Sequence, residues 1–257
     1  MRVTFDSNVW QMVVMPNLAR KTSLHDAFTA VHEALCTEQI QGFICETVGT
    51  LEAVRLTGRK AYFTAIKPIV EVKADAHGGQ AHLTINIDTD HNQHPGLPNV
   101  LRERLKLAFA LGMRLMRAPR IGIPIPASFL GMSVFADEVD VPTSAARDNR
   151  WGDVIETIER RGVGPAVLRL LETETRRKPE SLREEEFARA VAEWADGDSV
   201  AAHVAYSNDV FCTEDQGKSA GGRSILDADN RLWLAETHNV KFATIRELAA
   251  QRRSVQT

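Results

Sequence analysis

Four acidic residues, Asp6, Glu46, Asp198 and Asp215, occur where strands are predicted to end or where the helices that follow them begin. In a parallel sheet the carboxyl ends of neighbouring strands meet at one edge, so these side chains are expected to gather there. Carboxylates at close range repel one another unless a cation neutralises them. Mg²⁺ and Mn²⁺ prefer oxygen ligands, and the four residues are therefore candidate catalytic residues and candidate ligands of such an ion.

The elements that would position the first two acids are short strands, each followed by a helix. Residues 2 to 5 form a β-prone run that ends at Asp6, and apolar residues at helical spacing follow it. Residues 42 to 45 are predicted to be a buried strand, and Glu46 is predicted to open a second helix that Gly58 ends. Both acids therefore lie at predicted strand-to-helix junctions.

The C-terminal part of the chain continues this alternation. Asp198 is predicted to lie in the first turn of a helix, residues 209 to 213 form the next candidate strand, and Asp215 follows that strand by two residues. A helix over about 227 to 237, a strand and a terminal helix complete the pattern. Alternating strands and helices predict an α/β fold, a three-layer α/β/α sandwich with a central and mainly parallel sheet.

The middle of the chain is predicted to be an insertion at residues 61 to 142 within a single domain of residues 1 to 257. Apolar and polar residues alternate along residues 67 to 88, as they do in the two strands of a β-hairpin. Asn99 can cap a helix that is predicted to run to about Arg117, and several of the remaining helix positions are basic. The fold is therefore expected to carry an inserted β-hairpin and helix.

The composition places limits on function and location. The chain has 257 residues, of which 44% are hydrophobic and 25% charged, and its net charge of -3 argues against a generally basic protein that wraps nucleic acid. Cys36, Cys45 and Cys212 lack the paired spacing of a zinc site, so reduced thiols in a cytoplasmic protein are expected. No secretion signal and no membrane span are expected, because long apolar runs are missing from the sequence.

These residues resemble the PIN domain family of metal-dependent ribonucleases, which includes the toxins of many bacterial toxin-antitoxin pairs. The matching motifs are Phe5-Asp6-Ser7-Asn8, the junction at Glu46, the helical sequence that begins at Asp198, and the strand that leads from Asp209 to Asp215. The resemblance covers the two ends of the chain. Nothing within residues 61 to 142 contributes to it.

The resemblance implies an endoribonuclease that hydrolyses RNA phosphodiester bonds with water activated by Mg²⁺ or Mn²⁺. The four acids named above would hold the ion, Asn8 would orient a water molecule or a ligand carboxylate, and Thr213 would hydrogen-bond Asp6 or the substrate phosphate. An RNA substrate, an antitoxin-like inhibitor protein and a homodimer are the partners that the family implies.

Several positions keep a second interpretation. Asp209 fits either a fifth active-site acid or a turn residue, and Asn8 also fits an Asx-turn. Lys218 and Arg223, in the loop after the last acid, fit phosphate-binding residues or ordinary surface charges. Asp196 is predicted to be exposed to solvent.

Two other functions remain open. The same carboxylates could serve a metal-dependent nuclease or phosphoesterase that acts on DNA or on a small phosphoester, since these residues do not distinguish RNA from DNA. The fold could also be retained as a non-catalytic binding module. That module would keep the acids but show no turnover.

Overall fold

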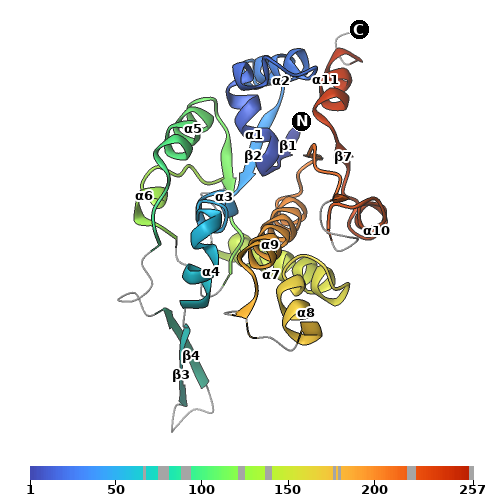
Figure 1. The fold of residues 1–257 in the computed structure, drawn as a ribbon. Helices are drawn as coiled ribbons and strands as arrows, with labels where there is room; N and C mark the ends of the chain where they lie inside the picture. The colour runs from blue at the N-terminus through green and yellow to red at the C-terminus, as the bar shows by residue number, and fades with distance from the viewer. Residues whose placement is uncertain are drawn as a thin grey trace.

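The computed structural model of the protein is built from strands and helices that mostly alternate along the chain (Figure 1). The structure describes residues 1–65, 68–74, 81–87, 94–120, 125–136, 141–175, 178, 181–218 and 224–254. The strands are β1 (Arg2–Phe5), β2 (Gln41–Cys45), β3 (Pro68–Ala74), β4 (Ala81–Ile87), β5 (Arg114–Met116), β6 (Val210–Cys212) and β7 (Phe242–Ala243). The helices are α1 (Ser7–Val14), η1 (Pro16–Ala19), α2 (His25–Cys36), α3 (Thr47–Thr50), α4 (Leu56–Ala65), α5 (Asn99–Ala110), α6 (Ala127–Leu130), α7 (Val141–Arg160), α8 (Ala166–Thr175), α9 (Glu184–Ala205), α10 (Ala228–His238) and α11 (Ile245–Ser254).

The main sheet has five parallel strands in the order β5-β2-β1-β6-β7. From β1 the chain builds outward through β2 to β5, and it then returns to the other side of β1 to add β6 and β7. The order of the strands therefore reverses between β1 and β6. In open parallel sheets, ligands bind beyond the carboxyl ends of the strands at such a reversal. Asp6 follows β1 and Thr213 follows β6, so both residues lie at this point.

Successive residues of the central strands point to opposite faces of the sheet, as a side-chain period of two requires. Phe43 and Cys45 of β2 belong to one apolar core, whereas Ile44 between them belongs to the other. In β6, Phe211 lies in the core of Phe43, and Cys212 lies in the core of Ile44. Two cores separated by one sheet give the three-layer α/β/α sandwich that the sequence pattern predicts.

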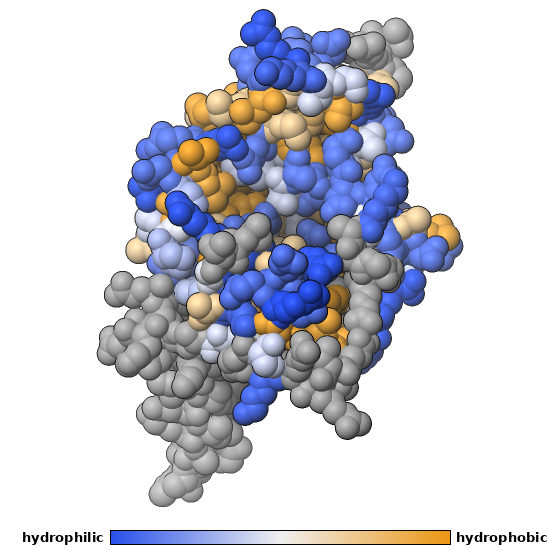
Figure 2. All heavy atoms as spheres, in the orientation of Figure 1, coloured by the Kyte–Doolittle hydropathy of each residue, from blue (hydrophilic) through white to orange (hydrophobic). Residues whose placement is uncertain are grey.

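The helices divide between these two faces. Residues of α1, α2, α5 and α11 enter the core of Ile44, and residues of α7, α9 and α10 enter the other core. In α2, Phe28, Val31 and Leu35 recur at helical spacing and are buried, and each contributes about 1.5–3 kcal/mol through its burial. Asp26 of the same helix is exposed, and the outer surface of α2 is hydrophilic at the top of Figure 2.

The segment after β2 differs from its prediction. Glu46 lies between β2 and α3 as expected, but α3 ends at Thr50, and Gly58 lies inside α4 instead of ending a helix. The residues of α3 are all buried, and an added Cβ at Gly49 would overlap the ring of Phe129. Tight packing therefore limits α3 to a single turn, and the chain bends after it.

Part of the segment at residues 61 to 142, which is predicted to be an insertion, belongs to the main sheet. β5 pairs in parallel with β2, and α5 packs against α1. The helix predicted to reach Arg117 ends at Ala110, because Gly112 adopts a φ of +85° and the chain continues into β5.

The β-hairpin expected in this range is confirmed. β3 and β4 pair antiparallel, with Val70 opposite Ile85 and Val72 opposite Leu83. The hairpin forms a separate two-stranded sheet that extends away from the main sheet, at the bottom of Figure 1. Among the described residues of this range, the hairpin therefore forms a sheet of its own.

Candidate active site

Asp6 and Asp215 are connected through Thr213 at the carboxyl ends of β1 and β6. The backbone N–H of Asp6 donates to the carbonyl of Cys212 (3.0 Å) and extends the pairing of the two strands. The Thr213 hydroxyl donates to Asp6 Oδ2 (2.6 Å) and accepts from the backbone N–H of Asp215 (3.0 Å). The three residues therefore form one hydrogen-bonded unit at the point where the strand order reverses.

Asn8 joins this unit from the first turn of α1. Its Nδ2 donates to Asp6 Oδ2 (3.0 Å) and to Thr213 Oγ1 (3.3 Å), and its Oδ1 accepts from the backbone N–H of Glu214 (3.2 Å). An Asx-turn would instead direct Oδ1 to a backbone N–H two residues further along the chain. The Asn8 side chain therefore holds the loop after β6 against the Asp6 carboxylate.

Two further acids, Glu52 and Asp196, lie within electrostatic range of Asp6. Burial raises the pKa of Glu52 to about 7, and the charge of Asp6 adds to the rise. Burial also raises the pKa of Asp196 well above its ordinary value, with the charge of Asp6 again the largest of the neighbouring contributions. The charge of each carboxylate makes ionisation of the others less favourable, so these carboxyl groups lie in one region. Asp6, Glu52, Asp196 and Asp215 are called the acidic cluster below.

The position of Asp196 follows from the register of α9. The His203 ring lies against β1, with 2.9 Å between its Nδ1 and Thr4 Oγ1, so the preceding turns of α9 reach the carboxyl edge of the sheet. Asp196 and Asp198 are two residues apart and therefore point about 200° apart around the helix. Asp196 faces the acidic cluster and is partly buried, so the prediction that solvent surrounds it is wrong.

Asp198 lies in the interior of α9, not in a first turn, and it faces a cation. Its carboxylate is 1% exposed and accepts from Arg120, with Nε donating to Oδ2 (2.7 Å) and Nη2 to Oδ1 (2.5 Å). The guanidinium of Arg120 is flanked by the rings of Trp151 and Trp194, at 5.3 and 5.0 Å from their centroids. Burial raises the pKa of Asp198 to about 6, and the charge of Arg120 opposes the rise.

Glu46 shares a small pocket with Asp198. Its Oε1 accepts from the backbone N–H of Ala118 (2.7 Å), while its buried Oε2 has no hydrogen-bond partner among the described residues. Burial raises the pKa of Glu46 to about 7. Glu46, Asp198 and Arg117 line a pocket of about 150 Å³, which we call the side pocket. The structure thus brings the four predicted acids together as two pairs, Asp6 with Asp215 and Glu46 with Asp198.

The remaining predicted site residues lie in three different situations. Asp209 precedes β6, at the opposite edge of the sheet from Asp6, and its Oδ2 accepts from the backbone N–H of Arg2 (2.7 Å). Lys218 is exposed on the loop that follows the acidic cluster. Arg223 lies outside the described residues. Asp209 therefore does not join the acidic cluster.

Glu52 and Asp196 were missed by the sequence argument. The sequence held an indication for Asp196. Glu193 and Asp196 are three residues apart and therefore place two acids on one face of a helix, whereas Asp198 shares its face with Trp194, four residues before it. Glu52 carried no such signal. Its direction depends on the bend after α3, which tertiary packing determines.

The acidic cluster offers carboxylate oxygens, which are the ligands that Mg²⁺ and Mn²⁺ prefer. In the described part of the chain, no group of three or more His, Cys, Asp or Glu side chains is arranged so that it could hold a metal ion. Mg²⁺ commonly binds only one or two protein carboxylates and takes its other ligands from water and phosphate. The linked carboxylates of Asp6 and Asp215 fit that mode of binding.

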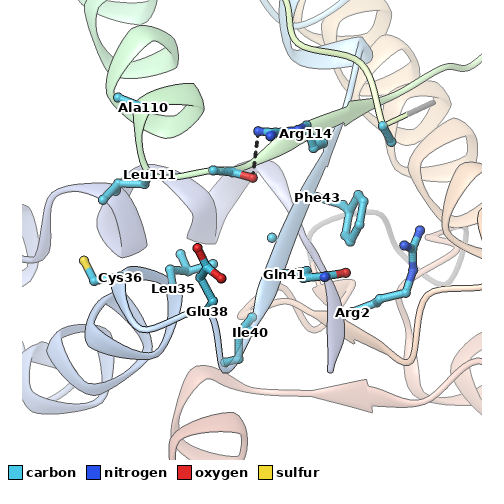
Figure 3. A pocket seen from close by; sticks show the side chains of 13 residues that line it. Arg2, Leu35, Cys36, Glu38, Ile40, Gln41, Phe43, Ala110, Leu111 and Arg114 are labelled. Atoms are coloured by element: carbon cyan, nitrogen blue, oxygen red, sulfur yellow. Dashed lines mark hydrogen bonds between the residues drawn. The ribbon is translucent and has the colours of Figure 1, made fainter. Parts of the chain in front are cut away.

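A second cavity, of about 610 Å³, opens at the other edge of the sheet (Figure 3). The two arginines that line it are already engaged. Arg114 Nη1 donates to the carbonyls of Gly112 and Met113, and the Arg2 guanidinium lies 4.3 Å from the centroid of the Phe43 ring. This cavity lies at the amino-terminal ends of the strands, away from the acidic cluster.

We expect the metal-free protein to become more stable as the pH falls from about 8 to about 5. The pKa of Glu52 and that of Glu193 are both raised to about 7 in the folded chain, whereas unfolded glutamate titrates near 4.3. Between these values the folded chain holds protons that the unfolded chain has released, so the free energy of unfolding decreases as the pH rises. Urea unfolding in EDTA across this range measures the effect. A flat or rising profile would contradict it, and Glu52→Gln should reduce the slope.

Comparisons of the chain with protein-family models, with curated proteins and with solved structures find no significant match. Over the residues that the structure describes, helices with the length and apolar character needed to cross a membrane do not occur.

Proposed function

We propose that the protein is a divalent-metal-dependent endoribonuclease and that the acidic cluster is its active site. The observation that carries the proposal is the hydrogen-bonded unit of Asp6, Thr213 and Asp215 at the reversal of strand order, with Glu52 and Asp196 facing it. Acids that raise one another's pKa weaken a fold, and such groups concentrate at functional sites. A bound cation would remove this repulsion.

The residues of the cluster have distinct roles in this proposal. Asp6 and Asp215 would hold the ion, and Glu52 and Asp196 would bind water molecules in its shell. Mg²⁺ or Mn²⁺, when bound, would lower the pKa of a water molecule and stabilise the charge that develops on the scissile phosphate. Thr213 already donates to Asp6 Oδ2, as does Asn8, while Oδ1 accepts from the backbone N–H of Ser7 (2.7 Å). These donors fix the orientation of the Asp6 carboxylate.

Arg231 is a cation that lies beside this site. Its Nη2 donates to the carbonyl of Asp215, and its positive charge opposes the rise that burial causes in the pKa of Asp6. The backbone N–H of Gly217 donates to Asp215 Oδ1 (2.8 Å), so the loop after β6 is held on two sides. Lys218 follows in this loop, is exposed, and would contact the phosphate backbone of the substrate.

The resemblance to PIN domain ribonucleases supports RNA as the substrate. Asp6 and Asp215 keep the chain order and the positions at strand ends that the resemblance implies. In this proposal Glu52 and Asp196 take the roles that the resemblance assigns to Glu46 and Asp198. The antitoxin-like inhibitor protein, the homodimer and the cytoplasmic location stay expectations.

The proposal predicts that the purified protein cleaves a mixed pool of RNA when Mn²⁺ is added and that EDTA abolishes the cleavage. Gel separation of end-labelled products measures it, with single-stranded DNA of the same sequences in parallel. Cleavage that is unaffected by EDTA, or the lack of cleavage with either metal ion, would overturn the proposal. Cleavage of DNA alone would assign the site to a DNA nuclease.

A further inference from the structure

The side pocket lies at the same edge of the sheet as the acidic cluster. Glu46 follows β2, Arg117 follows β5, and β2 lies between β5 and β1. α9 presents Asp196 to the acidic cluster and Asp198 to the side pocket. A polymer bound along this edge of the sheet would therefore reach both sites.

Three groups in the side pocket, from Glu46, Thr47 and Arg117, lack hydrogen-bond partners among the described residues. Oε2 of Glu46 is buried and accepts no hydrogen bond from a described residue. The Arg117 guanidinium stacks on Phe135, 4.1 Å from the ring centroid, and donates to no described residue. The charge of Arg117 acts on Glu46, so the acceptor and the cation are close neighbours. Buried polar groups without partners are rare in folded proteins and call for an explanation.

The other charged groups of the pocket are already paired. Asp198 accepts three hydrogen bonds from Arg120, and Asp148 accepts from Arg147 Nη2 (2.7 Å). Besides the hydroxyl of Thr47, a ligand would therefore meet one carboxylate acceptor, Glu46, and one guanidinium, Arg117. This pair suits a group that carries a hydroxyl donor beside an anion.

We propose that the side pocket binds a nucleotide of the RNA next to the scissile bond, with its phosphate on Arg117 and its ribose 2′-hydroxyl donating to Glu46. This inference rests on the proposed function and deepens it, because the 2′-hydroxyl is the group that distinguishes RNA from DNA. Glu46 is then a specificity-determining residue for RNA, and Arg117 serves RNA and DNA alike.

The test is a binding experiment in EDTA, where metal-dependent cleavage does not interfere. Fluorescence anisotropy compares labelled single strands of one mixed sequence set as RNA, as DNA and as 2′-fluoro RNA, which cannot donate from the 2′ position. At pH 8, above the pKa of about 7 of Glu46, the wild-type protein should bind RNA about tenfold more tightly than the other two, as expected for one hydrogen bond to a charged group. Glu46→Met should lower the affinity for RNA to that for DNA and leave DNA unchanged.

Two variants control this comparison. Arg117→Met should weaken all three ligands by similar factors and reduce the salt dependence of binding, as the loss of a phosphate contact does. Glu33→Met, the same change on the exposed surface of α2, should alter none of them. If Glu46→Met fails to fold, Glu46→Gln keeps an acceptor for Ala118 N–H. Its amide presents a donor where the carboxylate presented an acceptor, so the 2′-hydroxyl loses its acceptor and the preference for RNA over 2′-fluoro RNA should decrease.

The outcomes separate this inference from the proposed function. If the protein cleaves RNA with metal but Glu46→Met keeps the preference for RNA, the proposed role of the side pocket is overturned and the proposed nuclease activity stands. An RNA preference that depends on Glu46, in a protein that cleaves nothing, supports the pocket and overturns the nuclease. Equal affinity of the wild-type protein for RNA and DNA also overturns the role of the pocket.

Discussion

Asp6→Asn is expected to lower metal-dependent RNA cleavage by about 10³-fold, because a ligand whose charge offsets that of the ion is replaced by a neutral amide. The same change should raise the stability of the metal-free protein. Asp6 is 2% exposed, and burial raises its pKa by more than the hydrogen bonds from Thr213 and Ser7 lower it, so its ionised form weakens the fold. Single-turnover cleavage with Mn²⁺ measures the first effect, and urea unfolding in EDTA measures the second.

The two effects together distinguish an active-site acid from a structural one. A residue that only held the loop after β6 would lose activity and stability at once, whereas functional acids are commonly kept at the expense of stability. Mn²⁺ should raise the melting temperature of the wild-type protein and have little effect on Asp6→Asn, because binding to the folded state stabilises it. Asp153→Asn, on the exposed surface of α7, provides the matched control. Full activity of Asp6→Asn would end the proposal for this site.

Much of the fold could be predicted because local patterns and tertiary packing agree along most of the chain. The apolar run that ends at Phe5 and the run before Glu46 became β1 and β2, and the strand before Thr213 became β6. Parallel pairing of β1 with β6 then places Asp6 beside the loop that carries Asp215. This half of the candidate site follows from the order of the elements alone.

The fifth strand could not be predicted in the same way. Leu101, Leu105, Ala108 and Leu115 keep a helical spacing through residues that the structure divides between α5 and β5. Gly112, with its positive φ, was the only local indication of a stop. Pairing of β5 with β2 decides the outcome, and that pairing joins residues far apart in the sequence.

The placement of Glu52 and Asp196 depended on the directions in which their side chains point, and the spacing of residues in the sequence does not give those directions. An acid at a strand end is placed by the strand, but an acid on a helix is placed by the phase of that helix against the sheet. A start of α9 at Asp198 was predicted, whereas the helix begins at Glu184, and its phase is set by contacts such as that of His203 with Thr4. A shift of two residues then selects Asp196 in place of Asp198.

Asp196→Asn and Asp198→Asn are therefore expected to have opposite effects. Asp196→Asn should lower metal-dependent cleavage by about 10²-fold and leave the metal-free protein at least as stable as the wild type. Asp198→Asn should lower the free energy of unfolding by about 3 kcal/mol, because the guanidinium of Arg120 then keeps only its longer contact with Glu159 Oε1 (3.8 Å). Urea unfolding and single-turnover cleavage, both measured below the melting transition of each variant, test the two changes.

A double variant separates loss of the ion pair from loss of a metal ligand. Arg120→Met with Asp198→Asn removes the cation that has lost its close partner and leaves an apolar side chain between the rings of Trp151 and Trp194, so much of the lost stability should return. Cleavage by this double variant should stay within about tenfold of the wild type, since Asp198 faces the side pocket. A stable Asp198→Asn protein with cleavage reduced about 10²-fold would instead return Asp198 to the metal site and remove Asp196 from it.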